Sequence, residues 1–109
     1  MNVTLYFWQR ATALLLAPLV LTHLLLILYA VRGGLTATEI LARTQGSIGW
    51  GVFYGLFVIA AALHASIGLR TIISEWGRVQ GGLANAIASA FGLLMLMLGG
   101  RAIYAVIVL

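Results

Sequence analysis

The sequence predicts an all-α membrane protein with three transmembrane helices. Of its 109 residues, 63% are hydrophobic and 7% are charged, and the mean hydropathy is +1.13. Three long apolar stretches alternate with short polar connections, and each stretch reaches the roughly 20 residues that cross a bilayer. Water-soluble domains of this size do not have such a composition, so we expect a single transmembrane domain over residues 1–109.

The first span is expected over residues 11–31. It is too long for the apolar core of a signal peptide, so we expect it to be retained. The preceding lead-in is mildly amphipathic and carries Tyr6, Phe7 and Trp8, residue types that favour the membrane interface. Pro18 lacks a backbone donor and is expected to kink the span.

A short surface helix is expected in the polar connection that follows. Thr36 can cap it, because Glu39 stands three residues later and completes a capping box. The second span is expected at about residues 50–73. Gly51 and Gly55 form a small-xxx-small pair there, which favours close contact with another helix.

The third span is expected at about residues 83–108. Ala84, Ala88 and Gly92 repeat every four residues and predict a second close-packing face. Arg101 falls inside this span, so its side chain either extends outward to the headgroups or faces a partner protein.

The charged residues predict how the chain is oriented in the membrane. The net charge of +4 comes from six Arg and two Glu, with no Lys, and no basic patch indicates nucleic acid as a partner. Three spans place Arg10, Arg70 and Arg78 on one side and Arg32 and Arg43 on the other. The excess of arginine on the first side predicts a cytoplasmic N-terminus, and Arg at span ends indicates contact with membrane lipids.

His64 is the first candidate for chemistry, because polar side chains inside a membrane span are costly and seldom idle. It is either an imidazole hydrogen-bonded to a neighbouring helix or an axial ligand of haem iron. Gly68 falls on the same helical face one turn later and leaves room for a flat ligand, which favours the haem ligand. The chain has no cysteine, which excludes iron–sulfur clusters held by this chain alone.

His23 is the second imidazole within a span. If Arg10 and Glu75 mark the same water interface, His23 lies about 20 Å and His64 about 16 Å from it, and the two could share one haem iron. However, Arg10 and His23 are about 140° apart around their helix. If Arg10 pairs with a haem propionate, the His23 side chain points away from that haem. His23 is then an interhelical hydrogen-bonding residue or part of a polar pocket in the outer leaflet.

Glu75 and Trp76 follow the second span at the membrane interface. They are either a solvated acid beside an interfacial aromatic residue, or part of a site for a quinone head group. In the quinone site, the Trp76 indole N–H donates a hydrogen bond and Glu75 relays protons from water. Arg70 lies near the same depth, where it faces headgroups, a quinone or a subunit above the membrane.

These residues resemble a known family, the small hydrophobic membrane-anchor (D-type) subunits of succinate dehydrogenase, respiratory complex II, with cytochrome b556. The resemblance covers most of the chain. The third span matches only in being an apolar transmembrane span. Two motifs carry it: Arg10-Ala11-Thr12-Ala13, and His64-Ala65-x-Ile67-Gly68 followed by Glu75-Trp76.

The resemblance implies a complex in a bacterial inner membrane, in which this chain is a non-catalytic anchor. A second three-helix anchor, the partner cytochrome b subunit, completes a six-helix bundle, and flavoprotein and iron–sulfur subunits bind its cytoplasmic face. Electrons from succinate pass through flavin and iron–sulfur clusters to ubiquinone or another quinone, which joins the tricarboxylic acid cycle to the respiratory chain.

The resemblance also assigns roles to individual residues. His64 matches one axial ligand of haem b, whose other ligand comes from the second anchor, and Arg10 matches the arginine that contacts a haem propionate. Glu75 and Trp76 match an acidic–aromatic pair beside the quinone, which in this family is often Asp then Tyr. Trp donates a hydrogen bond but has no phenolic proton. His23 has no role in the family's pattern.

Three other classes of protein are alternatives to this one. A small multidrug-type transporter needs an acid within a span, whereas Glu39 and Glu75 both lie in connections. A self-contained cytochrome b would use His23 and His64 as its two ligands. A non-redox assembly or scaffold subunit would use His64 for structure alone.

Overall fold

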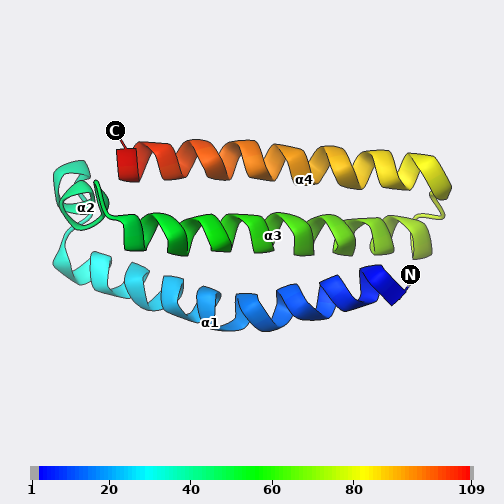
Figure 1. Ribbon diagram of the computed structural model, residues 1–109, viewed down its shortest axis with the longest axis horizontal. Coiled ribbons are helices and arrows are strands. Elements are labelled where there is room, and N and C mark those ends of the chain that lie inside the picture. Colours follow the sequence, from blue (N-terminus) through cyan, green and yellow to red (C-terminus); the bar gives the residue numbers. More distant parts are fainter. Residues whose placement is uncertain (1–2, 109) are drawn as a thin grey trace.

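The computed structural model describes residues 3–108 and consists of three long antiparallel helices with a short one across one end (Figure 1). Residues 1, 2 and 109 of the expected domain lie outside it. Three helical segments are long and apolar enough to cross a membrane, which confirms the predicted fold class. The helices are α1 (Val3–Gly33), α2 (Ala37–Thr44), α3 (Ile48–Glu75) and α4 (Gly81–Ile103), and a π-helical turn, η1 (Tyr104–Val108), extends α4.

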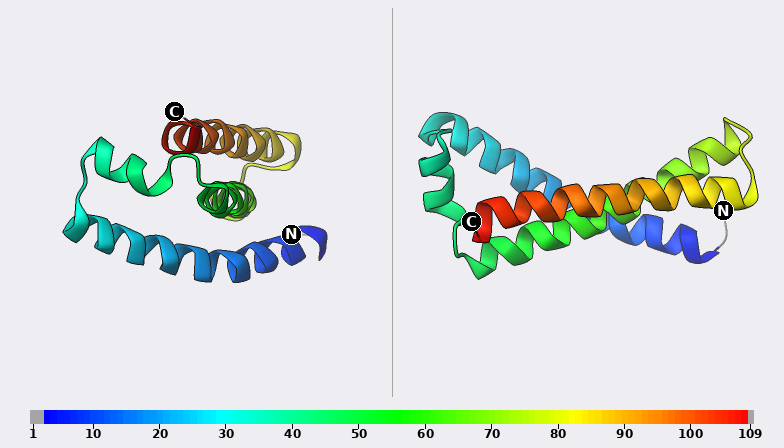
Figure 2. Two further views of the ribbon diagram at one scale, coloured as in Figure 1. Left: turned by 60° about the vertical axis from the view of Figure 1, so that its left-hand side comes forward. Right: turned by 90° about the horizontal axis from the view of Figure 1, so that it is seen from above.

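Helix α3 is the centre of the bundle. It packs against α1 on one side and α4 on the other, and Figure 1 shows it between them. The left view in Figure 2 shows the same order. Because α3 carries His64, its two neighbours decide which groups reach that imidazole.

Helix α1 begins at Val3 rather than near residue 11. The described part of the lead-in contains no Gly or Pro, so nothing interrupts the helix before the span. Arg10 therefore lies about two turns inside α1 rather than at its start. Pro18 is in the helix interior, where its missing N–H accounts for the bend of α1 in Figure 1.

The close packing of α3 and α4 depends on small residues of α4. Ala84, Ala88 and Gly92 are all buried, as their spacing predicted. Ser66 of α3 donates a hydrogen bond to the Ala88 carbonyl at 2.8 Å, and a Cβ on Gly92 would lie 3.1 Å from the Ser66 Cβ. The two backbones approach this closely because no side chain separates them.

Enlarging Gly92 is therefore expected to destabilise the helix pair. In Gly92→Leu the new side chain meets α3, and overpacking of this kind costs about 1–3 kcal/mol. Gly100 is the control, because a Cβ there has no neighbour within 4 Å. Thermal unfolding in detergent should show a lower midpoint for Gly92→Leu than for Gly100→Leu. Equal midpoints would contradict the described packing.

The other small pair does not form a close helix contact within this chain. A Cβ on Gly55 would have no neighbour within 4 Å, and one on Gly51 would meet only the Ile107 side chain at 3.7 Å. The expectation for this pair is wrong among the described helices. The glycines that α4 packs closely against α3 are its own, Gly92 against Ser66 and Gly99 against Val58, further towards the C-terminal end of α3.

The end of the bundle that carries α2 is closed by side-chain hydrogen bonds. Thr36 caps α2 as predicted: its hydroxyl accepts from the Glu39 N–H at 3.2 Å and donates to the Glu39 carboxylate at 2.7 Å. Thr44 donates to the Val106 carbonyl at 2.7 Å. Because Val106 belongs to η1, this bond joins α2 to the chain's C-terminal turn.

Candidate functional site

The side chain of His64 lies at the contact between α3 and α1. Its Nδ1 atom is 3.0 Å from the hydroxyl oxygen of Thr12. Thr12 is only 5% exposed, which makes it one of the few buried polar residues among those described, whereas His64 is half-buried. The expected hydrogen bond from His64 to a neighbouring helix is therefore present, and it uses one ring nitrogen only.

The hydroxyl of Thr12 also bonds to its own helix. Its oxygen is 2.7 Å from the Trp8 carbonyl oxygen and 3.1 Å from that of Gln9. Thr12 had no expected role beyond its place in a motif, although it is a polar residue within an apolar helix, as His64 is. The partner of Thr12, His64, follows only from the packing of α1 against α3.

Gly68, one turn after His64, also faces α1. A Cβ there would lie 3.3 Å from the side-chain nitrogen of Gln9. The space that we expected for a flat ligand is thus lined by the Gln9 amide. The side-chain oxygen of Gln9 is buried and has no hydrogen-bond partner among the described residues.

Arg10 points away from the contact between α1 and α3. It is two residues before Thr12, so the two side chains are about 160° apart around the helix. Arg10 is exposed, and its guanidinium carbon lies 5.6 Å from the centre of the Tyr6 ring. At the helical rise, Arg10 is about 3 Å along the axis from Thr12. It is therefore close in depth to His64 but does not touch it.

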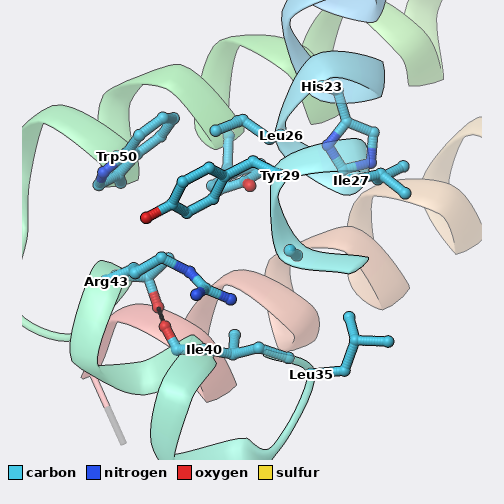
Figure 3. A pocket seen from close by; sticks show the side chains of 11 residues that line it. His23, Leu26, Ile27, Tyr29, Leu35, Ile40, Arg43 and Trp50 are labelled. Atoms are coloured by element: carbon cyan, nitrogen blue, oxygen red, sulfur yellow. Dashed lines mark hydrogen bonds between the residues drawn. The ribbon is translucent and has the colours of Figure 1, made fainter. Parts of the chain in front are cut away.

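His23 lies against aromatic residues of α3. Its ring makes edge-to-face contacts with Tyr54 and Phe57, with centroid distances of 5.9 and 5.2 Å. Its Nδ1 atom is buried without a hydrogen-bond partner among the described residues. His23 also lines a pocket of about 470 Å³. Figure 3 shows this pocket with Tyr29, Trp50 and Arg43 on its walls.

The two histidines lie at different depths in the bundle. Phe57, which contacts His23, precedes His64 by seven residues, a separation of about 10 Å along α3. The expected similar depth was wrong because it took Arg10 as level with Glu75, whereas Thr12 is level with His64.

At the end of α3, Arg70 and Glu75 line one pocket of about 260 Å³ with residues that begin α4, among them Gln80 and Gly81. Glu75 itself is exposed. Arg70 donates from Nε to the side-chain oxygen of Asn85 in α4, so it faces α4 and the pocket. The sequence did not indicate this contact, although Asn85 is a polar residue at the start of an apolar span.

Trp76 stands apart from this pocket. It is 84% exposed and caps the C-terminus of α3, where its backbone N–H donates to the Ile72 carbonyl. It is not among the residues that line the pocket of Arg70 and Glu75. The structure therefore brings Arg70 and Glu75 together and leaves the Trp76 indole directed outward.

Comparison with known proteins gives one match. Residues 1–100 match the family model of the succinate dehydrogenase/fumarate reductase transmembrane subunit. No curated protein and no solved structure matches the chain. The matched residues include α1, α2, α3 and most of α4.

Proposed function

Because this chain belongs to the family of succinate dehydrogenase/fumarate reductase transmembrane subunits, we propose that it is a D-type anchor of a succinate:quinone oxidoreductase. Its three apolar helices would form half of a six-helix bundle with a second anchor subunit. An iron–sulfur subunit and a flavoprotein subunit would bind the end that carries Glu75. The chain itself would supply ligands and surfaces, and the succinate chemistry would belong to the flavoprotein.

The observation that carries this proposal is the state of His64. Its ring is half-buried on a membrane-spanning helix, and Nδ1 is paired with Thr12. No hydrogen bond to Nε2 is formed within residues 3–108, so that nitrogen suits a haem iron. Haem b, when bound, supplies a one-electron redox centre inside the bilayer. His64 would be one axial ligand, and the second anchor would give the other.

Two further residues would lie near the depth of the same haem. Arg10 is exposed on the side of α1 away from Thr12 and His64, so its long side chain would have to reach around α1 to pair with a propionate. Gly68 would keep the porphyrin edge clear of a side chain, provided that the Gln9 amide moves from its position over this residue. His23 is too far along the bundle to take part in binding this haem.

The pocket between α3 and α4 would receive the quinone head group. Arg70 and Gln80 line it and can donate hydrogen bonds, and Glu75 lines it and is exposed. Quinone reduction consumes protons, and Glu75 would relay them from the aqueous side. Trp76, exposed at the same end, would complete the quinone site from its outer edge.

The same end of the bundle would face the cytoplasm of a bacterial cell. The start of α1, the end of α3 and the start of α4 lie together there (Figure 1). Arg70 and Arg78 stand at or near this end and Arg10 is two turns away, whereas Arg32 and Arg43 stand at the other end and Arg101 lies in the last turn of α4 towards it. The arginines are therefore equal in number towards the two ends and do not orient the chain by themselves. The proposed binding of the flavoprotein and iron–sulfur subunits at the Glu75 end would put the N-terminus in the cytoplasm.

Co-purification tests the proposed assembly. The chain, carrying an affinity tag and extracted in a mild detergent, is expected to recover a flavoprotein, an iron–sulfur protein and a second hydrophobic anchor. Covalent or tightly bound flavin can be measured in the same sample by fluorescence. Recovery of the chain alone, from membranes that oxidise succinate, would count against the proposal.

A further inference from the structure

Thr12 stands out because its hydroxyl joins two helices at the proposed haem ligand. We propose that Thr12 is a positioning residue that fixes the tautomer and the ring orientation of His64, so that Nε2 carries the lone pair offered to iron. This inference rests on the proposed haem-binding function of His64. It concerns Thr12, which would not itself touch the haem.

The hydroxyl hydrogen of Thr12 points towards its own helix. A distance of 2.7 Å to the Trp8 carbonyl oxygen is the usual length of an O–H···O hydrogen bond. If the hydrogen pointed to His64 instead, two oxygen atoms would face each other at that distance with lone pairs only, which is repulsive. Back-bonding of a helical Thr to the fourth preceding residue is also a common arrangement.

The direction of this hydrogen determines the state of the imidazole. The Thr12 oxygen has no second hydrogen to give, so at 3.0 Å from Nδ1 it accepts the N–H of the ring. A neutral imidazole carries only one such hydrogen. His64 is therefore protonated at Nδ1 and has its lone pair at Nε2. Metal-binding histidines commonly donate their other ring nitrogen in this way.

The position of Thr12 makes the contact rigid. Thr12 is 5% exposed, and its branched side chain has few rotamers in a helix. Its oxygen is also held by the carbonyls of Trp8 and Gln9. The His64 ring is thus fixed from α1 although it belongs to α3. The inference predicts that haem binding depends on the hydroxyl and tolerates the loss of the methyl group.

The experiment compares haem in the complete complex for variants of two threonines. Thr12→Val and Thr12→Ala remove the hydroxyl, and Thr12→Ser keeps it. Thr22→Val is the matched control, since Thr22 makes the same back-bond to Pro18 at 2.7 Å but is exposed and has no histidine partner. The ratio of haem to flavin is measured on the purified complex. The haem midpoint potential is measured by redox titration followed in the visible spectrum.

Loss of the hydroxyl is expected to weaken haem binding by about 10–100-fold, as for other partners of metal-bound histidines. Because a less basic imidazole stabilises ferric iron less, the midpoint should rise. A tenfold loss confined to the ferric form corresponds to about 59 mV. Thr12→Ser should keep the wild-type midpoint, and so should Thr22→Val. A purely structural role would lower the yield of complex without moving the midpoint.

The outcomes separate this inference from the function on which it rests. Wild-type haem content and midpoint in Thr12→Val would overturn the role of Thr12. If that variant yields no complex, Thr12→Ala decides instead, because alanine favours helix and removes the same hydroxyl. If His64→Leu keeps its haem, the proposed function fails first, whatever the Thr12 variants show.

Discussion

Replacing His64 by leucine is expected to remove haem from the complex while flavin and iron–sulfur subunits remain bound. Leucine fills a similar apolar volume on α3 but offers no lone pair, so the iron would lose one of its two axial ligands. The loss of hydrogen bonding to Thr12 leaves the Thr12 hydroxyl bonded to Trp8, which limits the structural cost. The reduced-minus-oxidised spectrum should lose the b-type band, or show it with a shifted midpoint.

His23→Leu is the control for this variant. His23 is also an imidazole within a span, but it contacts Tyr54 and Phe57, about 10 Å or more along α3 from His64. Its replacement is expected to leave the haem spectrum intact. An unchanged spectrum in His64→Leu, or loss of haem in His23→Leu alone, would refute the assignment of His64 as the ligand.

Replacing Glu75 by glutamine should slow quinone reduction by about a hundredfold, the lower end of the range for a lost proton-transfer group. Glutamine keeps the size and hydrogen bonding of Glu75 but cannot exchange a proton with water. Succinate oxidation coupled to an artificial dye bypasses the quinone and should keep its wild-type rate. Paired assays with a quinone and with a dye, on one membrane preparation, measure the difference.

Glu39→Gln is the matched control, because Glu39 is the other acid of the chain and lies in the first turn of α2 at the opposite end of the bundle. Its replacement should affect neither assay by more than a small factor. Equal loss of quinone and dye activities in Glu75→Gln would indicate failed assembly and would contradict a role in proton transfer.

Local features of the fold were predictable from the sequence. The three spans follow from hydropathy, the cap at Thr36 from its spacing to Glu39, and the packing face of α4 from a repeat of small residues that the structure buries. Each of these features depends only on residues that are near one another in the sequence of one helix. For the same reason, the grouping of Arg70 and Glu75 near one end could be expected from their positions.

Relations between helices were harder to predict. The contact of Thr12 with His64 depends on the position of α1 along the axis of α3. Periodicity within either helix does not determine that position. This contact also replaced the conditional estimate that put His23 and His64 at similar depths, because it makes Thr12 rather than His23 level with His64. Gly51 and Gly55 show the same limit, since a small pair indicates a possible contact but not whether a helix of the same chain forms it.

The amount of haem in the purified complex tests the central claim most directly. The complex is isolated through this chain in mild detergent, and haem and flavin are quantified in the same sample. We predict equal amounts of the two, with a b-type spectrum that His64→Leu abolishes or shifts. A complete flavin-containing complex without haem, whose His64 ring lies against acyl chains, would contradict the claim that this helix holds a redox centre.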